Sequence, residues 1–261
     1  MFQTAVLASG SKGNSILIRT ESTKILLDAG LSGKKISGFL QDLHLDETKI
    51  NALLISHEHS DHIKGAGVIC RKFKIPMYIT EQTFLSSRHR IGNVPEGIKY
   101  FETGDKFQVG DIIINSFPSS HDVVDGANFT FQKADDKLRK LAVATDLGYS
   151  TRLMLRKFKK ATSIILESNH DEKMLLEGPY PWDLKQRVKS RHGHLSNEQA
   201  VGVISRIIHP GLKNLVLAHL SEVNNDPEIA RILMQEYLAS INFDLNLIIS
   251  SQYKATALID I

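Results

Sequence analysis

The most informative stretch of this chain is His57-Glu58-His59-Ser60-Asp61-His62, in which four potential metal ligands fall within six residues. It follows the apolar, strand-like run at residues 52–55. Histidines two positions apart cannot share one helical face, but they can converge from the turn that leaves a strand. Asp61 and His62 then open the next helix, where they can reach a second ion. Imidazoles and carboxylates at this spacing are typical of a two-metal hydrolytic centre.

Three further apolar runs each deliver one ligand-type residue at their end. His121 follows the predicted strand at 111–117, Asp146 ends the run at 141–146, and His219 ends the run at 215–219. A single histidine at a strand end is more often a hydrogen-bonded structural residue than a ligand. The repeated arrangement favours the ligand interpretation here, because rigid strands hold ligand atoms with the precision that a metal site requires.

This combination of residues resembles the metallo-β-lactamase superfamily, and the resemblance extends over essentially the whole chain. It implies one domain at 1–261 of α/β (α+β) class, a four-layer αβ/βα sandwich of two mostly antiparallel or mixed sheets with outer helices. It also implies two divalent metal ions, zinc or manganese. By the resemblance, metal 1 is held by His57, His59 and His121, metal 2 by Asp61, His62 and His219, and Asp146 bridges both.

An early aspartate, Asp28, belongs to the same family pattern because it ends the strand-like run that precedes Ala29-Gly30. Its implied role is to orient a ligand histidine by hydrogen bonding. The alternative is an ordinary turn-forming aspartate.

Composition and charge agree with a globular enzyme. The chain has 261 residues, enough for a full core, and 42% of them are hydrophobic. Its net charge of +3 is compatible with an anionic substrate. The single cysteine, Cys70, argues against a disulfide framework and suits a reducing compartment. No window resembles a membrane span. We therefore expect a cytoplasmic protein without a membrane partner, while the sequence leaves its oligomeric state open.

A second pair of residues indicates the type of reaction. Glu167 ends a predicted strand and His194 precedes a predicted helix, so the carboxylate can aim the imidazole and keep it protonated. Such an imidazolium beside two metals can stabilise a phosphoryl group or protonate a leaving oxygen. The pair resembles the Glu and His of the phosphodiesterase branch of the superfamily. With Asp61, they are the catalytic candidates; the alternative is a turn cap and a surface histidine. His170 either joins their network as an orienting residue or is solvated.

Several segments resemble one branch of the superfamily in particular, the YycJ/WalJ group of bacterial proteins. They are residues 7–11, 28–32, 57–62, 167–171, 178–182 and 193–197. That resemblance implies a DNA exonuclease acting from the 5′ end, so that DNA is favoured over RNA as the partner.

Candidate substrate contacts come from two segments. Tyr180, Trp182, Lys185 and Arg187 precede His194 and combine aromatic surface for base stacking with cations for phosphates. The alternative is a solvated helix face with Trp182 packed inward. The turn at 9–14 offers backbone N–H groups that could hold a terminal phosphate, or it is a plain hairpin turn. Its candidate contacts are Ser9, Ser11, Lys12 and Asn14.

A further basic cluster follows Asp146, at Arg152, Arg156, Lys157, Lys159 and Lys160. A surface helix explains it nearly as well as a nucleic-acid contact does.

Together these features predict a dinuclear metal-dependent phosphodiesterase, a 5′-to-3′ DNA exonuclease that uses a hydroxide bridging the metals. Two alternatives stay open. One is a hydrolase of small phosphodiesters or thioesters with the same fold. The other is a metal-containing nucleic-acid-binding or regulatory module without hydrolysis. Structural metal sites are normally closed to water, whereas two ions that share Asp146 leave room for a water, which favours the enzyme.

Overall fold

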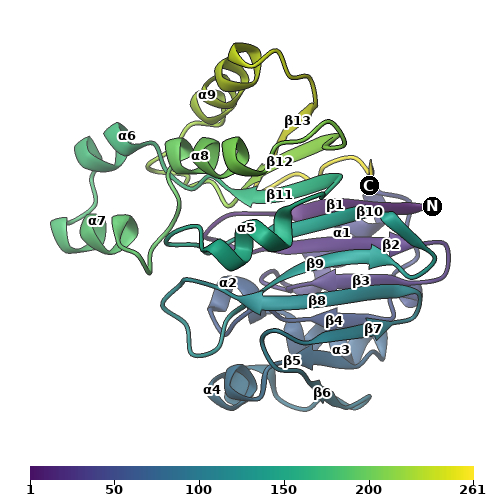
Figure 1. Cartoon of the computed structure of the whole chain (residues 1–261). Coiled ribbons are helices and arrows are strands. Elements are labelled where there is room, and N and C mark those ends of the chain that lie inside the picture. Colours follow the sequence, from purple (N-terminus) through teal and green to yellow (C-terminus); the bar gives the residue numbers. More distant parts are fainter.

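Two seven-stranded sheets lie face to face in the computed structural model, which describes residues 1–261 (Figure 1). Helices cover the outer face of each sheet, so the molecule has four layers. Both sheets are mixed, each with an antiparallel and a parallel half. The expected four-layer αβ/βα sandwich is therefore confirmed. None of the helices combines the length and apolar character that a membrane crossing requires.

The first sheet has the strand order β14-β1-β2-β3-β4-β5-β6. Its strands are β1 (Phe2–Ala8), β2 (Ser15–Thr20), β3 (Lys24–Leu27), β4 (Ala52–Leu54), β5 (Met77–Ile79), β6 (Ile98–Tyr100) and β14 (Ile259–Asp260). The turn at 9–14 joins β1 and β2 in a hairpin, and the strand-like run before Asp28 is β3. The helical elements on this side are α1 (Gly33–Asp42), η1 (Glu47–Lys49), α2 (Ser60–Ile63), α3 (Ala66–Phe73) and α4 (Glu81–Ile91).

The second sheet has the order β13-β12-β11-β10-β9-β8-β7. Its strands are β7 (Lys106–Val109), β8 (Ile112–Pro118), β9 (Ala127–Lys133), β10 (Asp136–Ala144), β11 (Ser163–Glu167), β12 (Asn214–Ala218) and β13 (Asn246–Ile249). Its helices are α5 (Arg152–Phe158), α6 (Glu172–Glu177), α7 (Trp182–Lys189), α8 (Asn197–Ile207) and α9 (Pro227–Ser240). Figure 1 shows α5, α8 and α9 over the outer face, whereas α6 and α7 project beyond the sheet edge.

The core has three layers because most strands are buried on both faces. In β1, Val6 joins the cluster between the sheets, whereas Ala5 and Leu7 join the cluster under the helices of the first sheet. This alternation is the two-residue period of a strand. A third cluster lies between the second sheet and its helices. Strands buried on both sides read as continuous apolar runs, which is why they were recognisable in the sequence.

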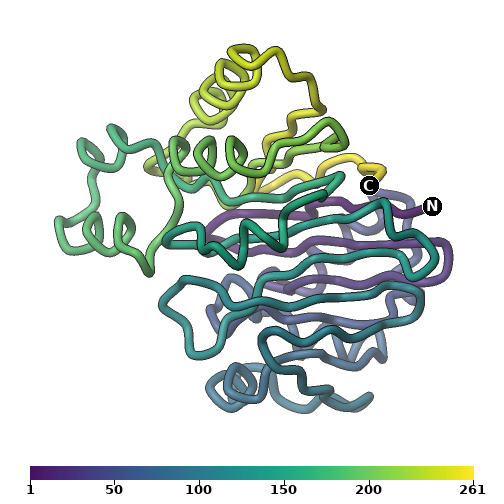
Figure 2. Tube along the Cα trace, in the orientation of Figure 1, coloured from purple at the N-terminus to yellow at the C-terminus, as the bar shows by residue number.

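The topology gathers the functional residues at one edge of the sandwich. Five parallel strands end there, and a polar residue lies at or just after the end of each: Asp28, His57, Asp146, Glu167 and His219. Ligands in open α/β sheets bind outside such carboxyl ends. The tube in Figure 2 shows that chain segments from distant parts of the sequence meet at this edge.

Candidate metal centre

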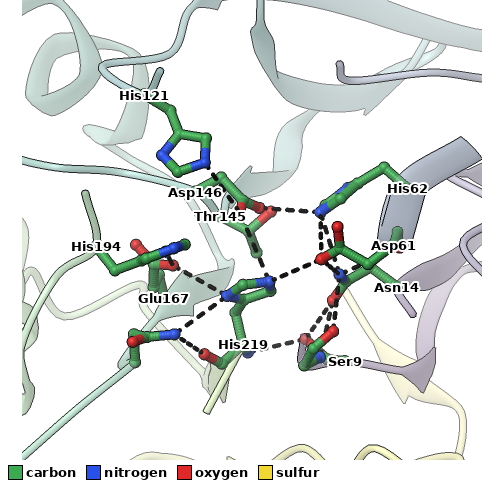
Figure 3. Close-up of polar contacts among 12 residues, drawn as sticks. Ser9, Asn14, Asp61, His62, His121, Thr145, Asp146, Glu167, His194 and His219 are labelled. Atoms are coloured by element: carbon green, nitrogen blue, oxygen red, sulfur yellow. Dashed lines mark hydrogen bonds and ion pairs between the residues drawn. The ribbon is translucent and has the colours of Figure 1, made fainter. Parts of the chain in front are cut away.

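The seven predicted ligands converge from both sheets, as Figure 3 shows for five of them. The ligand atoms of His57, His59 and His121 lie within 4.8 Å of one another, and so do those of Asp61, His62 and His219. Each triad has the membership that the family resemblance implies.

Asp146 lies between the two triads. Its Oδ2 is 3.2 Å from His62 Nε2, and its Oδ1 is 3.5 Å from His219 Nε2 and 3.8 Å from His121 Nε2. One carboxylate therefore faces ligand atoms of both triads, as a bridging ligand must.

Two buried ring nitrogens support a metal at this position. His57 Nε2 and His219 Nε2 are inaccessible to solvent and have no hydrogen-bond partner. Buried polar atoms are nearly always hydrogen-bonded, so unpaired lone pairs on converging side chains fit divalent cations. Imidazole and carboxylate donors accept zinc, manganese and other divalent ions, so the residues fit a two-metal site without selecting the metal.

The opposite ring nitrogens of the predicted ligand histidines are held by the protein. His62 Nδ1 is 2.8 Å from Asp28 Oδ2, which confirms the contact expected for Asp28. Ser56 also donates to Asp28, and its Oγ lies 2.9 Å from His57 Nδ1. His121 Nδ1 is 2.9 Å from the carbonyl oxygen of Gly193. Such contacts fix the ring orientation and turn Nε2 toward the other predicted ligands.

The backbone also takes an unusual conformation at three of these positions. Asp28, Asp146 and His219 have φ angles of 63°, 58° and 57°. The left-handed conformation costs about 1–2 kcal/mol for a residue other than glycine and persists only where the surrounding structure imposes it, as it often does at functional sites. Here it turns the chain sharply after β3, β10 and β12.

Glu167 and His194 form the expected pair. Glu167 Oε1 is 2.7 Å from His194 Nδ1, and Oε2 accepts hydrogen bonds from the N–H groups of Leu147 and Leu195. Oε1 also lies 3.2 Å from Nδ1 of His219, a predicted ligand, and the sequence did not suggest this contact. The completely buried carboxylate therefore positions two histidines.

Opposing effects set the pKa values of this pair. Burial favours neutral Glu167, but the adjacent His194 and His219 outweigh it and lower the Glu167 pKa to about 2. Burial likewise disfavours charged His194, but the Glu167 carboxylate outweighs it and raises the pKa of His194. The pair is thus carboxylate and imidazolium, the form required for donation to a phosphoryl oxygen.

Two of the predicted ligands, His57 and Asp61, are in the forms that bind metals. Burial holds the pKa of His57 well below its usual value, so its ring is neutral. Burial opposes ionisation of Asp61, yet the neighbouring His62 and His219 hold its pKa well below the usual range. Neutral imidazoles and ionised carboxylates are the forms required for coordination. At His62 and His219 burial is outweighed by the neighbouring carboxylates, which raise the pKa of each ring, so a metal ion would have to displace a proton there.

His170 is buried rather than solvated, so the solvated alternative is wrong. Burial is the main reason that its pKa falls to about 4, which keeps the ring neutral. Its carbonyl oxygen accepts a hydrogen bond from Asn197 N–H, but no hydrogen bond joins it to Glu167 or His194. Its orienting role stays a prediction.

A pocket of about 250 Å³ opens in front of the ligands. Among the predicted substrate contacts, Ser11, Tyr180 and Arg187 line it, together with His194 and the ligands His59, Asp61, His121, Asp146 and His219. Trp182, Lys185 and Lys12 do not line it. Trp182 is 64% exposed, so the inward-packed alternative is wrong. Lys185 Nζ donates to the carbonyl oxygen of Leu176, and Lys12 pairs with Glu222.

Ser9 and Asn14 are buried and contact the ligands directly (Figure 3). Ser9 Oγ accepts a hydrogen bond from the backbone N–H of His219 at 2.8 Å, and Asn14 Nδ2 donates to Asp61 Oδ2 at 3.2 Å. The turn at 9–14 therefore supports the triad of Asp61, His62 and His219, a role that sequence reasoning missed.

Comparison with known proteins relates this geometry to characterised families. Residues 23–220 match a family model described as a β-lactamase superfamily domain. The chain is 41% identical to exodeoxyribonuclease YycJ of Bacillus anthracis, covering 92% of this chain and 90% of that protein. It is 39% identical to exodeoxyribonuclease WalJ of Streptococcus pneumoniae, covering 100% of this chain and 98% of that protein.

Solved structures resemble the fold over nearly the whole length. The metallo-β-lactamase fold protein YhfI from Bacillus subtilis superposes with a TM-score of 0.74 at 15% identity, covering 98% of this chain and 99% of that chain. The short form of human tRNase Z superposes with a TM-score of 0.67 at 15% identity, covering 99% and 100%. At these identities the likeness concerns the fold alone.

Proposed function

The chain belongs to the YycJ/WalJ group of the metallo-β-lactamase superfamily, and on that premise we propose that it is a metal-dependent exonuclease that degrades DNA from the 5′ end. Two relatives with 41% and 39% identity over nearly the full chain are named exodeoxyribonucleases. The observation that carries the proposal is the Glu167–His194 pair beside the two ligand triads. A single domain with a buried, free Cys70 suits the cytoplasm, where we place this activity.

The residues present fit two divalent ions. His57, His59 and His121 would hold one, Asp61, His62 and His219 the other, and Asp146 both. When bound, such ions activate water and stabilise the negative charge that develops on a phosphoryl group. The chain contributes the preorganisation: Asp28, Ser56 and the carbonyl oxygen of Gly193 hold the histidine rings in place.

His194 supplies a proton donor next to that centre. Its ring lies 4.9 Å from that of His121 and 5.3 Å from that of His219, measured between centroids, and it lines the pocket. Because Glu167 holds Nδ1, Nε2 is free to donate to a phosphoryl oxygen or to protonate the leaving oxygen. A positioned imidazolium of this kind suits phosphodiester cleavage and favours it over thioester hydrolysis.

The test is a panel of 5′- and 3′-labelled single- and double-stranded DNA and RNA, with zinc or manganese added. We expect DNA to be degraded with early release of the 5′ label, and His57→Ala to be inactive. Release of the 3′ label first would contradict the polarity, and preference for RNA would contradict the substrate. Hydrolysis of bis(p-nitrophenyl) phosphate without digestion of any polymer would instead support the small-molecule alternative.

A further inference from the structure

Helix α7 is an unusual element, because it contains no buried residue. It projects with α6 past the sheet edge (Figure 1) and lies beside the pocket, which Tyr180, Leu184, Arg187 and Val188 line from this segment. A helix that adds nothing to the core needs another reason for its position.

The segment is fixed at its base. The N–H of Asp171, just before α6, donates to the carbonyl oxygen of Asn224 at 2.9 Å. Lys185 of α7 donates to the carbonyl oxygen of Leu176 in α6, and Lys189 lies 3.7 Å from Glu172. The two helices therefore form one unit.

An ion pair on the far side of the pocket also holds this pair of helices in place. Arg187 donates through Nε and Nη2 to Asp122 Oδ2, with Nε at 2.8 Å. Asp122 directly follows the ligand His121 in the loop between β8 and β9. The bridge thus joins α7 to the opposite side of the pocket, which both residues line.

The end of α7 also lies against the loop that carries His194. A Cβ atom added to Gly193 would lie 2.1 Å from the carbonyl oxygen of Val188 and 2.3 Å from that of Arg187. Only glycine permits this approach. His194 N–H in turn donates to the carbonyl oxygen of Val188 at 2.9 Å. The backbone of α7 is therefore in direct contact with the loop that carries His194, with no side chain between them.

We infer that α6 and α7, closed by the Arg187–Asp122 bridge, form the end wall of a pocket for one terminal nucleotide and thereby restrict cleavage to strand ends. This inference rests on the proposed nuclease function. The pocket of about 250 Å³ is smaller than the ~300–1,000 Å³ typical of sites for drug-sized ligands. The pocket therefore has room for one terminal nucleotide. A strand that continued past this nucleotide, away from the predicted ligands, would meet α7. A strand without an end has nothing to insert.

The test compares a linear single-stranded DNA with the same sequence as a covalently closed circle. We expect the wild type to digest the linear strand and leave the circle intact. Arg187→Gln breaks the bridge, and the double variant Tyr180→Ala/Leu184→Ala trims the wall. In both variants the circle should become a substrate and the circle-to-linear rate ratio should rise. For Arg187→Gln the rise should be up to about fivefold, the effect expected for losing a partly exposed ion pair. Arg231→Gln, which breaks the exposed pair with Glu228 on α9, is the matched control and should leave the ratio unchanged.

The outcomes separate the two ideas. Digestion of the circle by the wild type would overturn the end-wall inference, as would a circle resistant to every wall variant that still digests the linear strand. A wild type that digests neither DNA would overturn the proposed function and the inference with it.

Discussion

Glu167 connects the predicted proton donor, His194, with one of the predicted metal ligands, His219. Its Oε1 contacts both His194, which is not a predicted ligand, and His219, which is. Changes at His194 and at Glu167 should therefore have different consequences, although the two residues form one pair.

We expect His194→Ala to lower phosphodiester cleavage by about 10²-fold or more, with metal content unchanged, because it removes only the proton donor. Glu167→Gln should lower both cleavage and metal affinity, because His219 loses its carboxylate partner. Elemental analysis and rates on labelled DNA, measured side by side, check both expectations. A normal rate for His194→Ala would make it a structural residue and revive the thioester alternative.

Asp28 contacts one predicted ligand directly, His62, and reaches His57 only through Ser56, so it measures how far ring orientation affects metal binding. We expect Asp28→Ala to weaken binding of one of the two ions by about 10–100-fold, because the His62 ring loses the acceptor at Nδ1. Titration of the metal-free protein with zinc or manganese measures this. Asp46→Ala, which removes the N-cap of η1, is the control. Equal affinities in the two variants would assign Asp28 to the turn alone.

The convergence of the seven predicted ligands could be anticipated from the sequence because each lies in the motif or at a strand end. Their supports could not be predicted in the same way. Ser9 receives the His219 N–H across 210 positions of sequence, and the αL turn at Asp146 is not encoded by a glycine. Such contacts depend on the packing of two sheets, which local patterns do not specify.

At the scale of elements, strands buried on both faces were the most predictable, whereas exposed helices were not. The apolar runs at 52–55, 111–117, 141–146 and 215–219 correspond to β4, β8, the second half of β10 and β12. The sequence of α7 has basic residues on more than one side of the helix, so it does not show which side faces the pocket. In the structure Trp182 is exposed and Arg187 pairs with Asp122. Only the tertiary contact decides which side of such a helix faces the pocket.

Helix α5 begins just after the Asp146 turn and extends away from the site edge over the second sheet (Figure 1). Its region is rich in positive charge: burial and the neighbouring Lys157 and Lys160 lower the pKa of Lys140 to about 8. No carboxylate pairs with Arg156 or Lys160 among the ion pairs of the protein. This surface is therefore available to phosphates of a long substrate.

We expect Arg156→Ala/Lys160→Ala to weaken binding of long DNA and to reduce the slope of log affinity against log salt by about 1 for each lost phosphate contact. Fluorescence anisotropy at several salt concentrations measures it. Lys34→Ala/Lys35→Ala on α1 removes the same charge from the helices of the first sheet and serves as the control. If both double variants show the same slope, the α5 cluster is a solvated helix face.

At the scale of the whole molecule, the candidate metal centre joins the two sheets. His57, His59, Asp61 and His62 follow strand β4 of the first sheet, whereas His121, Asp146 and His219 follow strands of the second. Each triad takes ligands from both sets. Bound ions would therefore link the two halves of the sandwich and relieve the repulsion between Asp61 and Asp146.

Because the unfolded chain separates these ligands, the ions bind the folded state far better than the unfolded one. Free metal at about 1,000 times its dissociation constant should then stabilise the fold by ~4 kcal/mol. For a protein of this size that corresponds to a rise in Tm of roughly 8–16 °C. Calorimetry of the protein with chelator and with excess zinc or manganese measures the difference. His57→Ala, which removes one ligand at the sheet edge, should show a smaller difference while keeping a cooperative transition. An equal Tm with and without metal in the wild type would mean that the two sheets are held together by the hydrophobic cluster between them alone.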